Sequence, residues 1–139
     1  MTLMSSAPLM EPQIDLSLAP NSEAVSAARH SLDELKGLVP PEKLEDVELV
    51  VSELVTNSVR HAGLSPDDEI LLTVVISGRS VRGRVCDPGL GFEKPSELRP
   101  RSDFSGGWGL PIVETISDRW GVERNGSEEG LVCVWFEIG

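Results

Sequence analysis

Hydrophobic and polar residues alternate along several short stretches of the chain, a pattern that predicts β-strands. Two of these stretches are also rich in β-branched residues, which favour strands. The predicted strands cover residues 14–18, 70–77, 81–87, 119–124 and 131–138. Gly78-Arg79 separates the second from the third, and the glycine-containing stretch 125–130 separates the last two. We therefore expect two hairpins after a first, separate strand.

Other stretches repeat hydrophobic residues every three or four positions, which predicts helices with one apolar face. The predicted helices run roughly from residue 22 to 38, from 41 to about 62, and from 109 to 117. Pro41 and Pro111 suit the first turns of the last two, and Gly63 is a stop signal for the middle one. Together the elements predict a two-layer α/β sandwich, in which about three helices cover one face of a mainly antiparallel sheet of about five strands.

The length of 139 residues fits one compact domain. Residues 1–13 show no hydrophobic period and contain two prolines and three methionines, so we expect a mobile tail there and a folded domain over residues 14–139. The formal net charge of −11 argues against a DNA-binding role, because phosphate neutralisation needs a basic face. Any anionic ligand must therefore be bound by a local site.

The two cysteines, Cys86 and Cys133, lie in predicted strands and lack the spacing of a metal site. We expect both to be small buried hydrophobic residues. No stretch of the chain is long and apolar enough to cross a membrane, and residues 1–13 do not resemble a signal peptide. These features predict a cytoplasmic protein that does not contact a membrane.

Glu53, Asn57 and His61 follow one another at intervals of four residues on the middle helix, so they share one edge of it. A neutral carboxamide such as that of Asn57 can bind Mg²⁺ through its oxygen and a phosphate oxygen through its NH₂ group. Glu53, one turn earlier, is a candidate general base. The alternative is that these residues form an ordinary polar helix edge.

Asp87 ends a predicted strand directly before Pro88-Gly89-Leu90-Gly91. At that position a carboxylate can accept a hydrogen bond from an exocyclic amine such as that of adenine. The alternative is an Asx-turn, since Asp is common before Pro-Gly.

A second glycine cluster, Gly106, Gly107 and Gly109, precedes the last helix, where free backbone N–H groups can bind phosphate. The alternative is a flexible loop that ends at a helix. Residues 92–107 form a long connection without a hydrophobic period, which is typical of a functional lid or a disordered segment.

Taken in order, Glu53-x-x-x-Asn57, Asp87-x-Gly89-x-Gly91 and Gly107-x-Gly109-Leu110 resemble the N, G1 and G2 boxes of the GHKL ATPase superfamily, which has the Bergerat fold. Residues 53–62 further resemble the anti-sigma-factor serine/threonine kinases of bacteria and their stand-alone ATP-binding relatives. The resemblance covers roughly residues 16–139.

This resemblance implies ATP and Mg²⁺ as cofactors. Asn57 would hold Mg²⁺ against the ATP phosphates, and Asp87 would bind the adenine amine. Gly89 and Gly91 would make room for the nucleotide. Glu53 would be the catalytic base that activates a serine of a partner protein.

The resemblance also implies that residues 92–107 form a lid whose backbone at Gly107, Gly109 and Leu110 contacts the phosphates. His61 falls at a position that often lines the pocket in such proteins. The alternative for His61 is a helix-end residue stabilised by the helix dipole.

By the same resemblance, the protein would phosphorylate an anti-sigma antagonist on serine and would otherwise sequester a sigma factor, without contacting nucleic acid directly. It would form a homodimer through the sheet edge near the first strand. Leu131 and Trp108 replace a threonine and an arginine that are common in the family. They keep open a second hypothesis, a non-catalytic protein-interaction module of the same fold.

Overall fold

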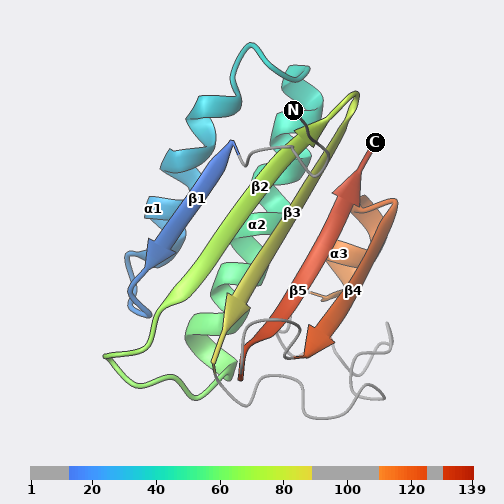
Figure 1. The fold of residues 1–139 in the computed structure, drawn as a ribbon. Coiled ribbons are helices and arrows are strands. Elements are labelled where there is room, and N and C mark those ends of the chain that lie inside the picture. Colours follow the sequence, from blue (N-terminus) through green and yellow to red (C-terminus); the bar gives the residue numbers. More distant parts are fainter. Residues whose placement is uncertain (1–12, 89–109, 125–129) are drawn as a thin grey trace, which may run out of the picture.

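A computed structural model describes residues 13–88, 110–124 and 130–139 of the chain. Their elements are, in order, β1 (Ile14–Leu18), α1 (Ala24–Ser31), the 3₁₀ turn η2 (Leu32–Leu35), α2 (Pro41–His61), β2 (Ile70–Ser77), β3 (Ser80–Asp87), α3 (Leu110–Ile116), β4 (Arg119–Arg124) and β5 (Val132–Ile138). The strands form one antiparallel sheet in the order β1-β2-β3-β5-β4 (Figure 1).

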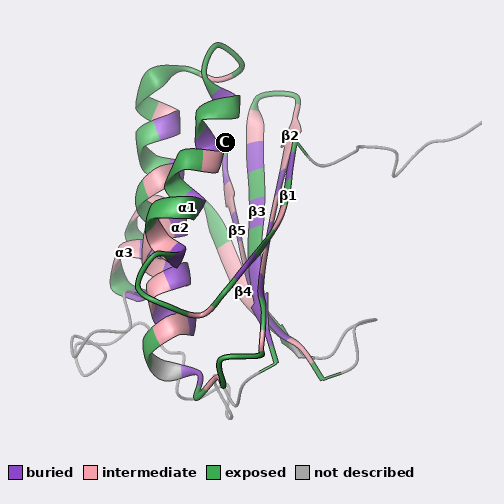
Figure 2. Ribbon diagram, turned by 90° about the vertical axis from the view of Figure 1, so that its left-hand side faces the viewer, coloured by how far each residue is buried: buried purple, intermediate pink, exposed green. Residues whose placement is uncertain are grey.

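The helices α1, α2 and α3 lie on one face of the sheet, and in the described part of the chain no helix covers the other face (Figure 2). The strand alternation follows from this arrangement: Ile70, Leu72 and Val74 of β2 are buried toward the helices, whereas Leu71 and Thr73 are only partly buried. The predicted two-layer α/β sandwich is confirmed. No helix in these same residue ranges is both long and apolar enough to span a membrane.

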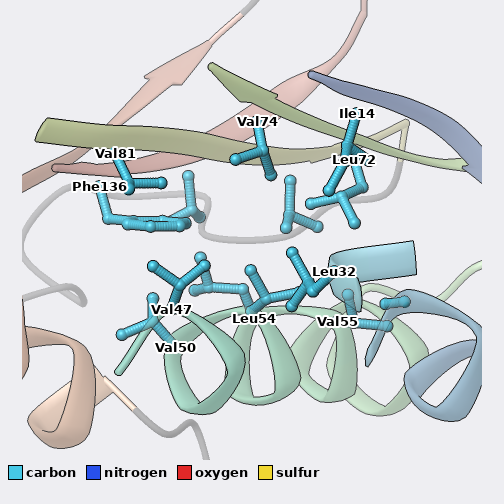
Figure 3. Close-up of a cluster of buried hydrophobic side chains, with 14 of the residues drawn as sticks. Ile14, Leu32, Val47, Val50, Leu54, Val55, Leu72, Val74, Val81 and Phe136 are labelled. Carbon is cyan, nitrogen blue, oxygen red and sulfur yellow. The ribbon is translucent and has the colours of Figure 1, made fainter. Parts of the chain in front are cut away.

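The core lies between the sheet and α2, and Phe136 of β5 is its largest fully buried side chain. Figure 3 shows its ring between Val81 on the sheet and Val47 and Val50 of α2. Gly83 of β3 lies directly opposite Phe136 in the sheet. A Cβ atom at Gly83 would lie 2.5 Å from Cζ of Phe136, so the ring occupies the space that any other side chain at position 83 would need.

Helix α2 begins and ends where the sequence predicts. Pro40 is extended, with φ −60° and ψ 148°, and Pro41 is the first helical residue. Gly63, two residues after the end of the helix, has φ +70°, a conformation that glycine adopts without a steric penalty. The helix is therefore delimited by local signals at both ends.

The predicted helix over residues 22–38 is wrong in its extent. It is an α-helix only over Ala24–Ser31, and the chain then tightens into the 3₁₀ turn Leu32–Leu35. Leu32 and Leu35, three residues apart, are both fully buried, and a 3₁₀ turn aligns such a pair on one side. Lys36 then becomes extended, with ψ 132°, which ends the helix.

The two cysteines are buried, as expected, but they are not the separate hydrophobic residues that the sequence indicated. Cys86 of β3 and Cys133 of β5 lie directly opposite each other and form a disulfide with an S–S distance of 2.08 Å. A cross-strand pairing of this kind depends on the β3–β5 register. It joins residues 47 positions apart in the sequence.

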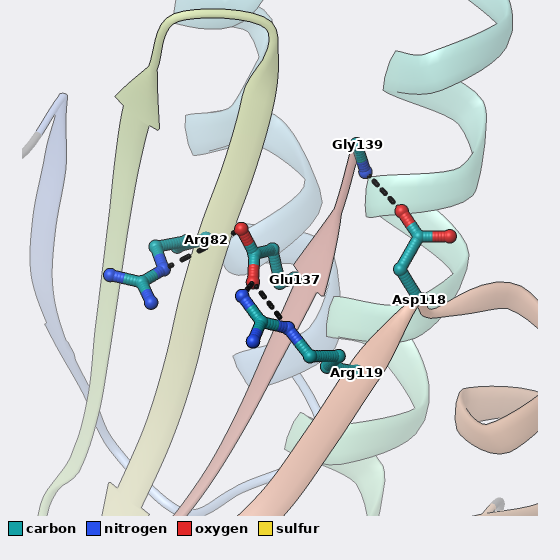
Figure 4. Close-up of polar contacts among 5 residues, drawn as sticks. All are labelled: Arg82, Asp118, Arg119, Glu137 and Gly139. Atoms are coloured by element: carbon teal, nitrogen blue, oxygen red, sulfur yellow. Dashed lines mark hydrogen bonds and ion pairs between the residues drawn. The ribbon is translucent and has the colours of Figure 1, made fainter.

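Polar contacts link β5 to both of its neighbours on the uncovered face of the sheet (Figure 4). Arg119 of β4 donates from Nη2 and Nε to Oε1 of Glu137, at 2.6 and 3.1 Å, and Nε of Arg82 on β3 lies 3.9 Å from Oε2. Both arginine side chains are more than half exposed, so these ion pairs add little to stability. The backbone N–H of Gly139 donates to Asp118 at 2.6 Å and holds the end of β5 beside the start of β4.

Candidate functional site

One buried hydrogen bond joins α2 to the end of β3. The hydroxyl of Ser58 donates to Oδ2 of Asp87 at 2.6 Å, and the two residues are only 5% and 6% exposed. A hydrogen bond to a charged group is among the stronger ones, so it fixes the direction of the carboxylate. The structure thereby places Asp87, the predicted adenine-binding residue, against the helix that carries Glu53 and Asn57.

Asn57 is the residue before Ser58 and is also buried, at 6% exposure. Within the described residues, neither its Oδ1 nor its Nδ2 has a hydrogen-bond partner. Leaving a buried carboxamide unpaired costs about 1–3 kcal/mol per group, and such exceptions need an explanation. The hydroxyls of Ser52 and Ser117 are also unpaired, but only Asn57 is next to the Ser58–Asp87 contact in the chain.

The unpaired amide of Asn57 fits the chemistry of a magnesium–nucleotide ligand. Its oxygen is a hard ligand of the kind that Mg²⁺ prefers, and its NH₂ group can donate a hydrogen bond to a phosphate oxygen. Both atoms would gain partners on binding, so the cost of leaving them unpaired would be removed.

Glu53 lies one turn before Asn57 on α2 and is partly exposed. Among the described residues it makes no hydrogen bond or ion pair. Its carboxylate is therefore one turn from Asn57 and reachable from solvent, as a general base that acts on a second protein would need to be.

The structure tests the placement of only some of the other predicted site residues. Leu110 is fully buried as the first residue of α3, so only its backbone is suited to contact a nucleotide. His61 is the last residue of α2, and its side chain is outside the described part. The glycines Gly89, Gly91, Gly107 and Gly109 and the predicted lid, residues 92–107, also lie outside it.

Sequence reasoning missed Ser58, which it did not name among the candidate site residues. The available signal was a small hydroxyl residue directly after Asn57 on the buried side of that helix. A hydroxyl there can satisfy a carboxylate that arrives from the sheet. Its partner Asp87 is 29 residues away, so the contact itself required the tertiary structure.

Comparison with known proteins agrees with this geometry. Residues 18–136 match the family model described as the histidine kinase-like ATPase domain. The chain belongs to the histidine kinase-like ATPase family. This match spans α1, η2, α2, β2, β3, α3 and β4 completely, and it includes the last residue of β1 and all but the last two residues of β5.

Two groups of relatives within this ATPase family are similar to the chain. The serine-protein kinase RsbW of Listeria monocytogenes serotype 4a (strain HCC23) is 34% identical over 122 residues, which cover 78% of each protein. The anti-sigma F factor of Clostridium acetobutylicum is 29% identical over 131 residues, covering 88% of this chain and 89% of the relative. Membership of the family implies that ATP is used.

In this ATPase domain, replacing Asn57 by leucine is expected to raise the free energy of unfolding by about 1–2 kcal/mol and to abolish measurable ATP binding. The substitution removes two unpaired polar atoms and keeps a side chain of similar shape. Urea denaturation and titration with Mg-ATP measure the two effects. Unchanged or lower stability would show that water already satisfies the amide.

Proposed function

We propose that the protein is an ATP-dependent serine/threonine kinase of the anti-sigma-factor type. It would phosphorylate a serine of an anti-sigma antagonist and would bind a sigma factor when not engaged with that antagonist. The observation that carries this proposal is the buried amide of Asn57, which has no partner among the described residues and directly precedes Ser58 of the Ser58–Asp87 hydrogen bond. The names of the relatives, a serine-protein kinase and an anti-sigma factor, support it.

Nucleotide binding would use Asp87 for the adenine and Asn57 for the phosphates. Asp87 would accept a hydrogen bond from the adenine amine, in an orientation set by Ser58. Asn57 would hold Mg²⁺ through Oδ1 and a phosphate oxygen through Nδ2. When bound, Mg²⁺ neutralises the phosphate oxygens and orients the γ-phosphoryl group for in-line transfer. Local binding of this kind suits a chain with a net charge of −11.

Glu53 would take the proton from the partner's serine hydroxyl as its oxygen attacks the γ-phosphorus. The new serine O–P bond forms as the bond between the γ-phosphorus and the bridging oxygen of ADP breaks, and ADP leaves with that electron pair. The partial exposure of Glu53 leaves room for a protein substrate to approach.

We also propose that the protein acts in the cytoplasm and as a homodimer. Strand β1 supports the second point, because it is at an edge of the sheet and its outer backbone groups are not used by β2. No contact with nucleic acid is part of the proposal.

Replacing Glu53 by glutamine is expected to lower phosphate transfer by a factor of about 100 to 10,000, the range that general-base catalysis supplies. ATP affinity should stay within about twofold, because the substitution preserves shape and removes only the base. Radiolabel transfer from ATP to candidate antagonists measures the first effect and calorimetry the second. A matched Ser52→Ala variant, one position earlier on α2, should behave as wild type in both assays. Full transfer activity in Glu53→Gln would exclude Glu53 as the base.

Leu131 favours the alternative function, a non-catalytic module of the same fold. It directly precedes β5 and is partly buried, so it offers an apolar surface where a threonine would offer a hydroxyl. A measurement of phosphate transfer to an antagonist distinguishes the two functions. Wild-type protein that binds Mg-ATP but transfers no phosphate to any antagonist would favour the module.

A further inference from the structure

The Cys86–Cys133 disulfide lies on the uncovered face of the sheet. The β-register places Leu71, Cys86, Cys133 and Glu123 in one row across β2, β3, β5 and β4. The helices cover the opposite face (Figure 2). Both cysteines are only 3% and 6% exposed, so neighbouring side chains shield the bridge. No described helix lies between the bridge and a thiol that approaches from this face.

The bridge is one residue from the predicted adenine contact. Asp87 follows Cys86 and is the last residue of β3, and its backbone pairs with Val132, the first residue of β5. Neighbouring residues of a strand point to opposite faces, so Asp87 points toward Ser58 on α2. The disulfide thus crosslinks the next-to-last residue pair of the β3–β5 ladder, beside the strand end, where ladders open most readily.

Disulfides are uncommon in the bacterial cytoplasm, where those that occur are usually transient or redox-sensing. We propose that Cys86–Cys133 is a reversible redox modification site whose substrate is a dithiol, and that its closed form holds Asp87 in the position that binds nucleotide. The first part rests on the proposed cytoplasmic location, and the second on the proposed nucleotide function.

The chemistry is a two-electron thiol–disulfide exchange. A thiolate of the dithiol attacks one cysteine sulfur, the Sγ–Sγ bond breaks, and the other cysteine leaves as a thiolate that takes up a proton. The second thiol of the reductant then resolves the mixed disulfide. The products are two protein thiols and an oxidised dithiol. An oxidised dithiol reverses the reaction.

The test compares Mg-ATP affinity in three preparations of the full chain: oxidised, reduced with dithiothreitol, and the Cys86→Ser/Cys133→Ser double variant. Thiol alkylation followed by mass spectrometry establishes the state of each. The oxidised protein is expected to bind about three- to tenfold more tightly than the reduced protein, because an unrestrained end of β3 must be ordered on binding. Re-oxidation with oxidised dithiothreitol should restore the affinity.

The double variant is the matched control. It should bind like the reduced protein and should not respond to dithiothreitol, which separates the bridge from other effects of the reagent. The oxidised–reduced comparison needs no variant, so a folding defect in the double variant would not remove the test. Equal affinity in the oxidised and reduced forms would overturn the coupling, and two alkylatable thiols after oxidation would overturn the modification site. Absence of ATP binding in every form would instead refute the proposed function.

Discussion

Replacing Asp87 by asparagine is expected to weaken ATP binding by about ten- to hundredfold and to leave the fold intact. A carboxylate accepts several hydrogen bonds through two oxygens, whereas a carboxamide has one acceptor oxygen and a donor NH₂ group. In the variant, the Ser58 hydroxyl and the adenine amine would compete for that single oxygen. A site built around a hydrogen bond loses affinity strongly when the bond cannot form.

Calorimetric titration with Mg-ATP measures this effect, and circular dichroism checks the fold. Ser58→Ala should cause a smaller loss, because it removes the group that orients Asp87 and leaves the acceptor in place. Glu53→Gln should leave affinity nearly unchanged. Wild-type affinity in Asp87→Asn would show that Asp87 does not contact the nucleotide.

Replacing Phe136 by alanine is expected to lower the free energy of unfolding by about 4 kcal/mol, a large part of the roughly 5–15 kcal/mol that stabilises a typical domain. The ring is fully buried between the sheet and α2, so its removal leaves a cavity in the centre of the core. Urea denaturation measures the change. Phe136→Leu should cost less, because leucine fills part of the volume.

Gly83→Ala tests the same packing from the opposite strand. Its Cβ would lie 2.5 Å from the Phe136 ring, so the substitution should cost about 1–3 kcal/mol through overpacking. In the Phe136→Leu background the cost should fall, because the ring that blocks the space is gone. Additive effects in this double-mutant cycle would mean that the Phe136 ring does not cause the cost of Gly83→Ala.

Most of the fold could be predicted from the sequence because its elements carry local signals. Strand alternation placed the five strands within one residue of the observed bounds, and the two prolines and Gly63 delimited α2 and α3. The exception was α1. Its hydrophobic period continues through Leu35, but the burial of Leu32 and Leu35 selects a 3₁₀ turn, which a helical period does not distinguish from an α-helix.

The sequence could predict which residues are candidates for the site, but it could not predict the contacts between them. The motifs around Asn57 and Asp87 identified candidates, whose roles stay predictions until they are tested. The hydrogen bond from Ser58 and the Cys86–Cys133 bridge both depend on which strand pairs with which helix or strand. The sequence contains no local signal for such long-range pairs.

In helix α2, core residues and candidate site residues alternate within the same helical turns. Leu54 and Val55 are buried in the core, and Glu53 and Asn57 are the proposed base and magnesium ligand. Inserting or deleting one residue before Glu53 would rotate the rest of the helix by about 100°. Such a change would turn Asn57 away from Asp87 and expose core side chains at the same time. A change in the length of this helix is therefore expected to damage both the stability of the core and the proposed nucleotide site.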